Sequence, residues 1–304
     1  MASNIAGDLS ARPRLLQDSE IRRSRGLLRD AWRRLVAGWN GRVGLVIIGL
    51  VLLAGVVTSL VDPYDPTTDS NLAESRQPPS WEHPFGTDRL GRDVFRRVLH
   101  GTRVSLMIGF VVVVVSGGVG TVLGLSAGYF GGFTDTLIMR LMDVLLAFPA
   151  ILLAIAIVAV RGPGLTNTIL AVAIVGIPGY ARVVRSVVLS LRERDFVDAA
   201  RMSGVSDLRI MFGHILPNSL TPIIVQMTLG VGGAIIFAAA LGFLGLGVQP
   251  PTPEWGAMIS DGIPFLRQSP YLVFYPGVAI MLTVLGFNLL GDGLRDALDP
   301  QLKG

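Results

Sequence analysis

Few residues of this 304-residue chain have the types and spacing that catalysis or phosphate binding would need. Its three histidines, His83, His100 and His214, show no metal-ligand spacing such as His-Glu-x-x-His. The sole lysine is Lys303, so a Gly-rich phosphate loop ending in Lys-Ser or Lys-Thr is impossible and a P-loop ATPase is excluded. Cysteine is absent, which excludes disulfides and thiolate chemistry. We therefore expect no catalytic residue, metal site or cofactor on this chain.

One polar segment, residues 192–218, has the pattern of a docking element for another protein. Its small residues Ala199 and Ala200 follow Asp198, and they favour a helix whose backbone a partner can approach closely. Gly204 can adopt a positive φ angle and end that helix. An ordinary amphipathic loop is the alternative interpretation.

The second half of the polar segment predicts another short helix. Ser206 can cap it, and Asp207 in its first turn would complement the helix dipole. Leu216-Pro217 closes the segment, because proline prevents simple continuation of a helix and would start the next apolar span. The pattern therefore indicates a helix–turn–helix.

Apolar helices must position this segment. The chain is 51% hydrophobic and 16% charged, against roughly 25% charged residues in an ordinary soluble domain. A spanning helix needs about 20 largely apolar residues, and the strict alternation of a membrane barrel is absent. We predict an all-α, polytopic membrane protein with six transmembrane helices. The stretches without Asp, Glu, Lys or Arg are 43–61, 104–134, 144–160, 162–181, 215–253 and 268–291.

Arginines flank the first of these stretches and predict the orientation. The positive-inside rule places an arginine-rich N-terminus in the cytoplasm, and alternation then also places the polar segment and the C-terminus there. The net charge of +4 suits lipid headgroups next to apolar helices better than nucleic acid. The expected divisions are a cytoplasmic N-terminal segment 1–42, a first transmembrane helix 43–61 retained as an anchor, an external loop 62–102, a membrane core 103–291 and a cytoplasmic tail 292–304.

The helix interiors are empty of charge. Ion-coupled carriers and pumps usually bury ionisable groups there, so an ion-coupled secondary carrier is disfavoured and a conduit powered by another protein is favoured. A non-transporting membrane scaffold is the third reading. Gln226 and Asn288 either line a cavity or serve helix packing, and the substrate-binding residues stay unassigned. Gly120, Gly124 and Gly128 form a packing stripe, either against a partner subunit or within this chain.

Four motifs in order resemble the permeases of ABC importers. The polar segment resembles the EAA loop, with Asp198 in place of its first Glu, Gly204 four residues after Ala200, and Leu216-Pro217 at its end. A second motif resembles the Gly-Thr-Asp-x-x-Gly-Arg-Asp segment of the second permease in dipeptide, oligopeptide and nickel importers. Two more lie at 128–149 and 276–300. The residues of the second motif are Gly86, Thr87, Asp88, Gly91, Arg92 and Asp93.

This resemblance implies a type I importer core of five helices preceded by an anchor helix, in the cell membrane of a prokaryote. It also implies a sister permease, two ABC ATPase subunits that carry the ATP and Mg, and an extracytoplasmic substrate-binding protein. The polar segment would couple the movement of the ATPases to this chain. The cargo would be a dipeptide or oligopeptide. A nickel chelate or another small solute is the alternative cargo.

Overall fold

The computed structural model describes residues 29–62, 64–65 and 69–298. Within these ranges the chain is helical apart from its connections, and the one strand-like contact is an isolated bridge between Thr87 and Asp93. The all-α prediction is confirmed, although the expected segments 1–42 and 292–304 lie partly outside the described residues. A helix over residues 29–37 precedes α2 (Trp39–Val61), η1 (Leu72–Glu74), α3 (Val94–Phe130), α4 (Gly132–Ala147), α5 (Ala150–Arg161), α6 (Leu165–Leu191), α7 (Asp195–Met202), α8 (Asp207–Ile210), η2 (Met211–Ile215, a π-helix), α9 (Leu216–Phe243), α10 (Trp255–Gly262), η3 (Ile263–Phe265) and α11 (Tyr271–Leu298).

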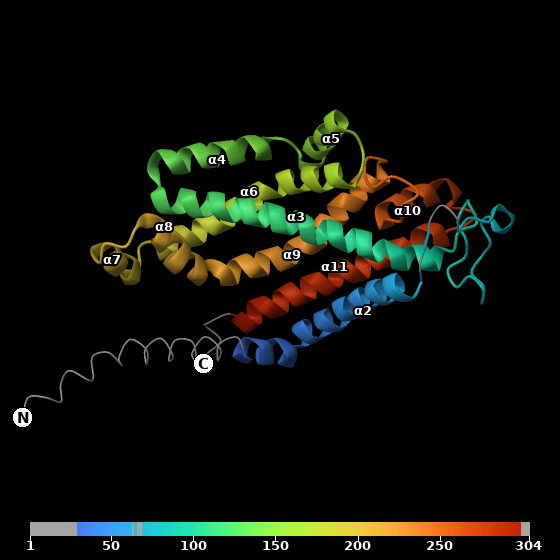
Figure 1. Cartoon of the computed structure of the whole chain (residues 1–304), viewed down its shortest axis with the longest axis horizontal. Helices are drawn as coiled ribbons and strands as arrows, with labels where there is room; N and C mark the ends of the chain where they lie inside the picture. Colours follow the sequence, from blue (N-terminus) through green and yellow to red (C-terminus); the bar gives the residue numbers. More distant parts are fainter. Residues whose placement is uncertain (1–28, 63, 66–68, 299–304) are drawn as a thin grey trace, which may run out of the picture.

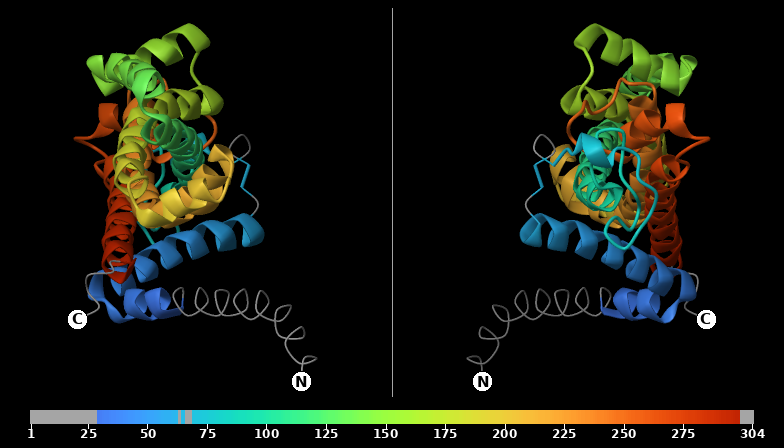
Figure 2. Two further views of the ribbon diagram at one scale, coloured as in Figure 1. Left: turned by 90° about the vertical axis from the view of Figure 1, so that its left-hand side faces the viewer. Right: turned by 90° about the vertical axis from the view of Figure 1, so that its right-hand side faces the viewer.

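Long helices run along the long axis of the molecule, with α7 at one end and α10 at the other (Figure 1). Helix α3 packs against α6 and α9, and α11 packs against α9 and α2. The end-on views place α4 and α5 on one side of this bundle and α2 on the opposite side (Figure 2). The bundle therefore holds the polar segment at one end, the α7 end.

Five helices of the described part are long and apolar enough to cross a membrane, and a bent pair would make a sixth. The pair is α4 and α5, whose axes differ by 89°. The uncharged stretch 144–160, in which a span was expected, is not one continuous helix, because the break between α4 and α5 falls inside it. Phe148 adopts an extended conformation, with φ −90° and ψ 138°, because the residue before a proline, here Pro149, is pushed out of the helical region.

Helix α3 begins earlier than its apolar run suggests. Asp93 caps it by accepting a hydrogen bond from the backbone N–H of Arg96 at 3.0 Å. The boundary expected at residue 103, between an external loop and the membrane core, therefore falls inside α3. A helix of 37 residues is about 55 Å long, so its first turns extend beyond an apolar layer of about 30 Å.

The glycine stripe of α3 lies against α6 of the same chain. A Cβ at Gly120 would approach Cβ of Tyr180 to 2.5 Å, one at Gly124 would meet Val184, and one at Gly128 would approach Cβ of Val188 to 2.8 Å. Glycine lets the two helix backbones approach closely. The stripe therefore packs against α6 of this chain. Of the two alternatives left open by its spacing, a partner subunit or this chain, the structure shows the second.

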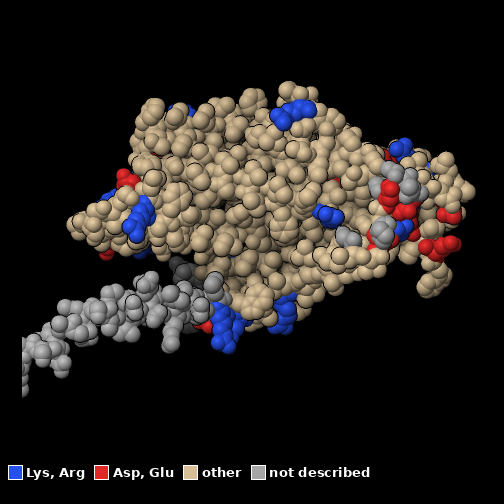
Figure 3. Space-filling model, in the orientation of Figure 1, with Lys and Arg blue, Asp and Glu red and all other residues tan. Residues whose placement is uncertain are grey.

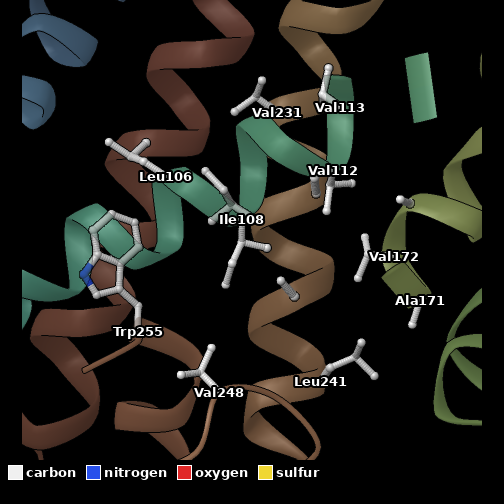
Figure 4. Packing of buried hydrophobic residues seen from close by; sticks show 14 of the residues in the cluster. Leu106, Ile108, Val112, Val113, Ala171, Val172, Val231, Leu241, Val248 and Trp255 are labelled. Atoms are coloured by element: carbon white, nitrogen blue, oxygen red, sulfur yellow. The ribbon is translucent and has the colours of Figure 1, made fainter. Parts of the chain in front are cut away.

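The core lies where α3, α6, α9 and α10 meet (Figure 4). Ile108 from α3 and Leu241 from α9 are almost fully buried there. Trp255, at the start of α10, is 1% exposed and donates its indole N–H to the carbonyl of Val98 at 3.0 Å. This hydrogen bond ties α10 to the first turns of α3.

Candidate functional site

The first half of the polar segment is a short helix with a left-handed stop. In α7 the backbone N–H of Gly204 donates to the carbonyl of Arg201 at 3.0 Å, and that of Val205 donates to Ala200 at 3.1 Å. This pair of bonds defines a Schellman motif, which requires a left-handed residue. Gly204 supplies it with φ +74°, as its position in the sequence predicts.

The second half is continuous with a membrane helix. Helix α8, the π-turn η2 and α9 together run from Asp207 to Phe243. Pro217 lies in the first turn of α9, which begins at Leu216, as expected of a proline that starts the next apolar span, but it does not stop the preceding short helix, which runs on into α9. The π-turn lies just before it and alters the hydrogen-bond register, so the missing N–H of the proline falls in the first turn of α9, where proline is tolerated. Ser206 occupies the N-cap position, but its side chain makes no capping hydrogen bond.

One face of the polar segment is fixed to the bundle. Val197 of α7, Ile210 and Ile215 are fully buried in a cluster with side chains of α3 and α6. Asp207 accepts a hydrogen bond from the hydroxyl of Tyr129 in α3 at 2.6 Å. The guanidinium of Arg192 donates to the carbonyl of Gly128 at 3.0 Å. The segment is therefore a packed extension of the long helices.

The other face of the polar segment exposes apolar side chains. Met202 is 87% exposed, Leu208 65% and Phe212 46%. Ala199 is also exposed, whereas Ala200 is half-buried against the cluster. Several large apolar side chains exposed on one short polar element are typical of an interaction site. Asp198 stays exposed at its edge and pairs with Arg201 at 3.4 Å.

If the polar segment has the coupling role that its resemblance to the EAA loop implies, replacing Gly204 with glutamate should weaken ATP-driven transport by about tenfold. The space around the glycine is open, so the cost comes from its positive φ angle, which costs an ordinary residue roughly 1–2 kcal/mol. The α7 end would be displaced while the membrane helices stay folded. The measurement is transport at matched permease levels. Gly204→Asn, which tolerates the left-handed region, should retain most of the rate, and full activity in Gly204→Glu would contradict this account.

The second motif closes the other end of the bundle. The Asp88 carboxylate is 6% exposed; it accepts hydrogen bonds from the guanidinium groups of Arg92, at 2.7 Å, and Arg97. It also accepts the backbone N–H groups of Leu90 and Arg92 at 2.8 and 3.0 Å. Charges buried this deeply are kept by pairing and hydrogen bonding. The motif therefore has a structural role: its buried hydrogen-bond network fixes the connection before α3 to the first turns of that helix.

Its remaining members shape the turn before α3. Gly86 and Gly91 have φ angles of +74° and +72°, and Gly91 lies directly on the carbonyl of Asn71. The hydroxyl of Thr87 accepts the backbone N–H of Gln77 at 2.8 Å. Asp93 contacts the imidazole of His83 at 2.9 Å, and this hydrogen bond raises the pKa of His83.

A buried carboxylate at the same end has no counterpart among the sequence predictions. Glu254 is 2% exposed and accepts the backbone N–H groups of Gly256 and Ala257 at 2.9 and 2.8 Å, which caps α10. Burial raises its pKa above the ordinary value. The described residues contain no group of three or more potential metal ligands.

A groove of about 210 Å³ lies between α3, α6 and α9. Its lining is apolar except for Ser116, Tyr180 and Gln226, and none of its lining residues is charged. Gly230 leaves room for the hydroxyl of Tyr180, because a Cβ there would overlap it. Asn288 is not part of this lining and lies near Gly232. Polar groups within membrane helices commonly mark a substrate pathway.

Charged side chains are unevenly distributed over the surface of the molecule. On the face shown in Figure 3, charged side chains are densest at the right-hand end of the molecule, a second group lies at the left-hand, α7 end, and separate basic groups lie along the upper and lower edges; most of the surface between the two ends is uncharged. Long apolar helices, an uncharged groove between three of them and exposed apolar side chains at the α7 end are together the features of a multi-pass transport permease.

Comparison with known proteins identifies its family. A family model described as the binding-protein-dependent transport system inner membrane component matches residues 120–304, and one described as the N-terminal TM domain of oligopeptide transport permease C matches residues 26–79. The chain belongs to the family of binding-protein-dependent ABC transport permeases. The second match shows family likeness in the N-terminal region, where the sequence motifs offered none.

Two curated relatives agree with this assignment. The dipeptide transport system permease protein DppC of Alkalihalophilus pseudofirmus is 53% identical over 277 residues, 90% of each chain. The glutathione transport system permease protein GsiD of Pectobacterium atrosepticum is 48% identical over 276 residues, 90% of this chain and 91% of that protein. A structure of the MetNI methionine ABC transporter in an inward-facing conformation matches with a TM-score of 0.56 at 17% identity, covering 67% of this chain and 97% of that chain; this likeness concerns the fold.

Proposed function

We propose that this chain is one permease of an ATP-driven peptide importer and that the polar segment couples it to separate ATPase subunits. One observation carries the proposal: the segment is packed onto α3 and α6 on one face and exposes Met202 and Leu208 on the other. A partner that moves this face would move two membrane helices with it. The arginines of the segment and of the region before α2 favour a cytoplasmic position for the α7 end and for both termini.

The cargo class follows from the relatives and from the groove. Peptides are named for relatives at 44% to 53% identity, and the groove offers hydrogen-bonding groups without charge. Such a lining suits backbone amides of varied peptides and leaves discrimination by charge to the binding protein. We propose that a sister permease faces this groove and completes the path. A nickel chelate has less support, because no cluster of potential metal ligands occurs in the described residues.

Replacing Gln226 with leucine should lower the peptide transport rate by about fivefold and leave ATP hydrolysis unchanged. Losing one hydrogen bond to the moving peptide costs about 1 kcal/mol, and 1.4 kcal/mol corresponds to tenfold. Thr228→Val on the same helix is the matched control, since Thr228 donates to the carbonyl of Ile224 and does not line the groove. Equal rates in the two variants would remove Gln226 from the path.

The function is tested by uptake of a labelled dipeptide into proteoliposomes. Uptake should require this chain, the sister permease, the ATPases, the binding protein and ATP together. Uptake through this chain without ATP, driven by an ion gradient, would contradict the proposal in favour of a secondary carrier. Assembly without any uptake of dipeptide, glutathione or nickel chelate would favour a scaffold.

A further inference from the structure

A tryptophan at the α10 end is fully displayed to solvent. Trp81 is 104% exposed, the largest value among the exposed apolar side chains of the described residues. It lies in the turn Ser80–His83, which we call the Trp81 turn. The backbone N–H of Ser80 donates to the carbonyl of His83 at 2.9 Å, and the N–H of His83 returns to the Ser80 hydroxyl at 3.0 Å. These two bonds close the turn and hold Trp81 at its tip.

The Trp81 turn is fastened to the helix bundle. His83 contacts Asp93, the cap of α3, at 2.9 Å and Glu74 at 3.5 Å. The connection is also tied to α11 three residues before and three residues after the turn. The hydroxyl of Tyr271 donates to the carbonyl of Gln77 at 2.9 Å, and the ring of Tyr271 packs on Gly86. The backbone that carries this large aromatic is therefore already ordered, so binding through Trp81 costs little backbone entropy, which favours its use as an interface anchor.

The position of the turn favours a partner across the end of the bundle. Figure 1 places the connection between α2 and α3 at the α10 end, and the right-hand view of Figure 2 shows it facing outward along the long axis. A sister permease must lie beside the membrane helices. A substrate-binding protein must lie across their ends.

Two observations disfavour lipid as the occupant. The turn is attached to the bundle at Asp93. The apolar run of α3 begins only after Arg103, ten residues further along the helix, so the attachment point lies about 15 Å from the start of that run at 1.5 Å per residue. Glu82 follows Trp81 in the chain, and Glu74 contacts His83, which fastens the turn to the bundle. Anionic headgroups would repel both carboxylates. An apolar pocket with a basic rim fits an aromatic flanked by carboxylates.

We propose that the Trp81 turn is a docking contact for the extracytoplasmic substrate-binding protein, with Trp81 inserted into an apolar pocket on it. This inference rests on the proposed function, because it takes the importer's binding protein as the partner. The acidic side chains beside the tryptophan then meet basic residues at the rim of that pocket. The contact positions the binding protein over the end of α3 and α11.

The test uses the complete transporter in lipid nanodiscs and measures the binding-protein concentration that half-maximally stimulates ATP hydrolysis. A central aromatic anchor contributes about 2 kcal/mol or more, so Trp81→Ala should raise this concentration by roughly 30-fold, and Trp81→Phe should restore most of it. ATP hydrolysis without binding protein should stay unchanged. Trp32→Ala, a 57% exposed tryptophan of the region before α2, should behave as the unmodified protein.

Each other outcome overturns the proposal. An unchanged concentration in Trp81→Ala removes the contact, and loss of the assembled complex assigns the turn to the sister permease. Because the chain has no cysteine, Trp81→Cys allows a single fluorescent label there, and its quenching by brominated lipids would assign the turn to the membrane. If the unmodified transporter shows no stimulation by any binding protein, the proposed function fails, and that result is distinct from failure of the Trp81 variants alone.

Discussion

Replacing Ala199 with tryptophan is expected to reduce peptide transport by roughly 100-fold while the permease still inserts and assembles its helices. Ala199 is exposed on α7, beside Met202, on the face opposite to buried Val197. A bulky side chain at this exposed position costs little in the isolated chain, but it must be accommodated in the proposed ATPase interface, where overpacking costs about 3 kcal/mol, equivalent to about 100-fold. The readouts are transport and ATP hydrolysis stimulated by the binding protein.

The matched control for this variant is Ala37→Trp. Ala37 is an exposed alanine in the helix before α2 and is not part of the polar segment, so transport should persist. Ala200→Trp should also disrupt transport, but Ala200 packs against the buried cluster, and its failure would mix internal strain with lost docking. Full transport in Ala199→Trp would rule out the exposed face of α7 as the coupling surface.

Replacing Gly124 with leucine is expected to destabilise the folded permease by about 3 kcal/mol or more. A Cβ at this position would overlap the backbone carbonyl of Ala181 and approach Cβ of Val184 to 2.9 Å. Backbone cannot give way as a flexible side chain can, so α3 and α6 would have to separate. The measurement is the SDS fraction that unfolds half of the purified protein in mixed micelles.

Gly118→Leu is the control on the same helix. A Cβ at Gly118 meets nothing within 4 Å, so its leucine variant should unfold near the midpoint of the unmodified protein. Equal midpoints for the Gly118 and Gly124 variants would show that the seam between α3 and α6 tolerates bulk, and would contradict the packing described above.

The sequence predicted the helical class and the spans because runs of apolar residues are a local signal. It did not predict how each proline acts. Pro149 accompanies the 89° break between α4 and α5, whereas Pro178 lies inside α6 and Pro217 is absorbed after a π-turn. The same residue has three outcomes because the surrounding packing decides whether its missing hydrogen bond is compensated.

For the polar segment, too, the sequence predicted the local features and missed the long-range contacts. The left-handed stop at Gly204 follows from local chemistry and was predicted. The face that is anchored was not, because the contact between Tyr129 and Asp207 joins residues 78 positions apart. Tyr129 lies within a motif that carried the family resemblance, which was the one available signal. Similarly, Asp88 and Arg92 were identified as a motif, but only the fold shows their burial.

The most direct test of the account is cross-linking from the exposed face of the polar segment. The chain lacks cysteine, so Met202→Cys places a single reactive group on the side chain that is 87% exposed. In the assembled transporter, a photoactivatable cross-linker on this cysteine should capture an ATPase subunit, and the yield should change between nucleotide-free and ATP-bound states. Absence of any ATPase adduct in a transporter that is active in peptide uptake would contradict the central claim.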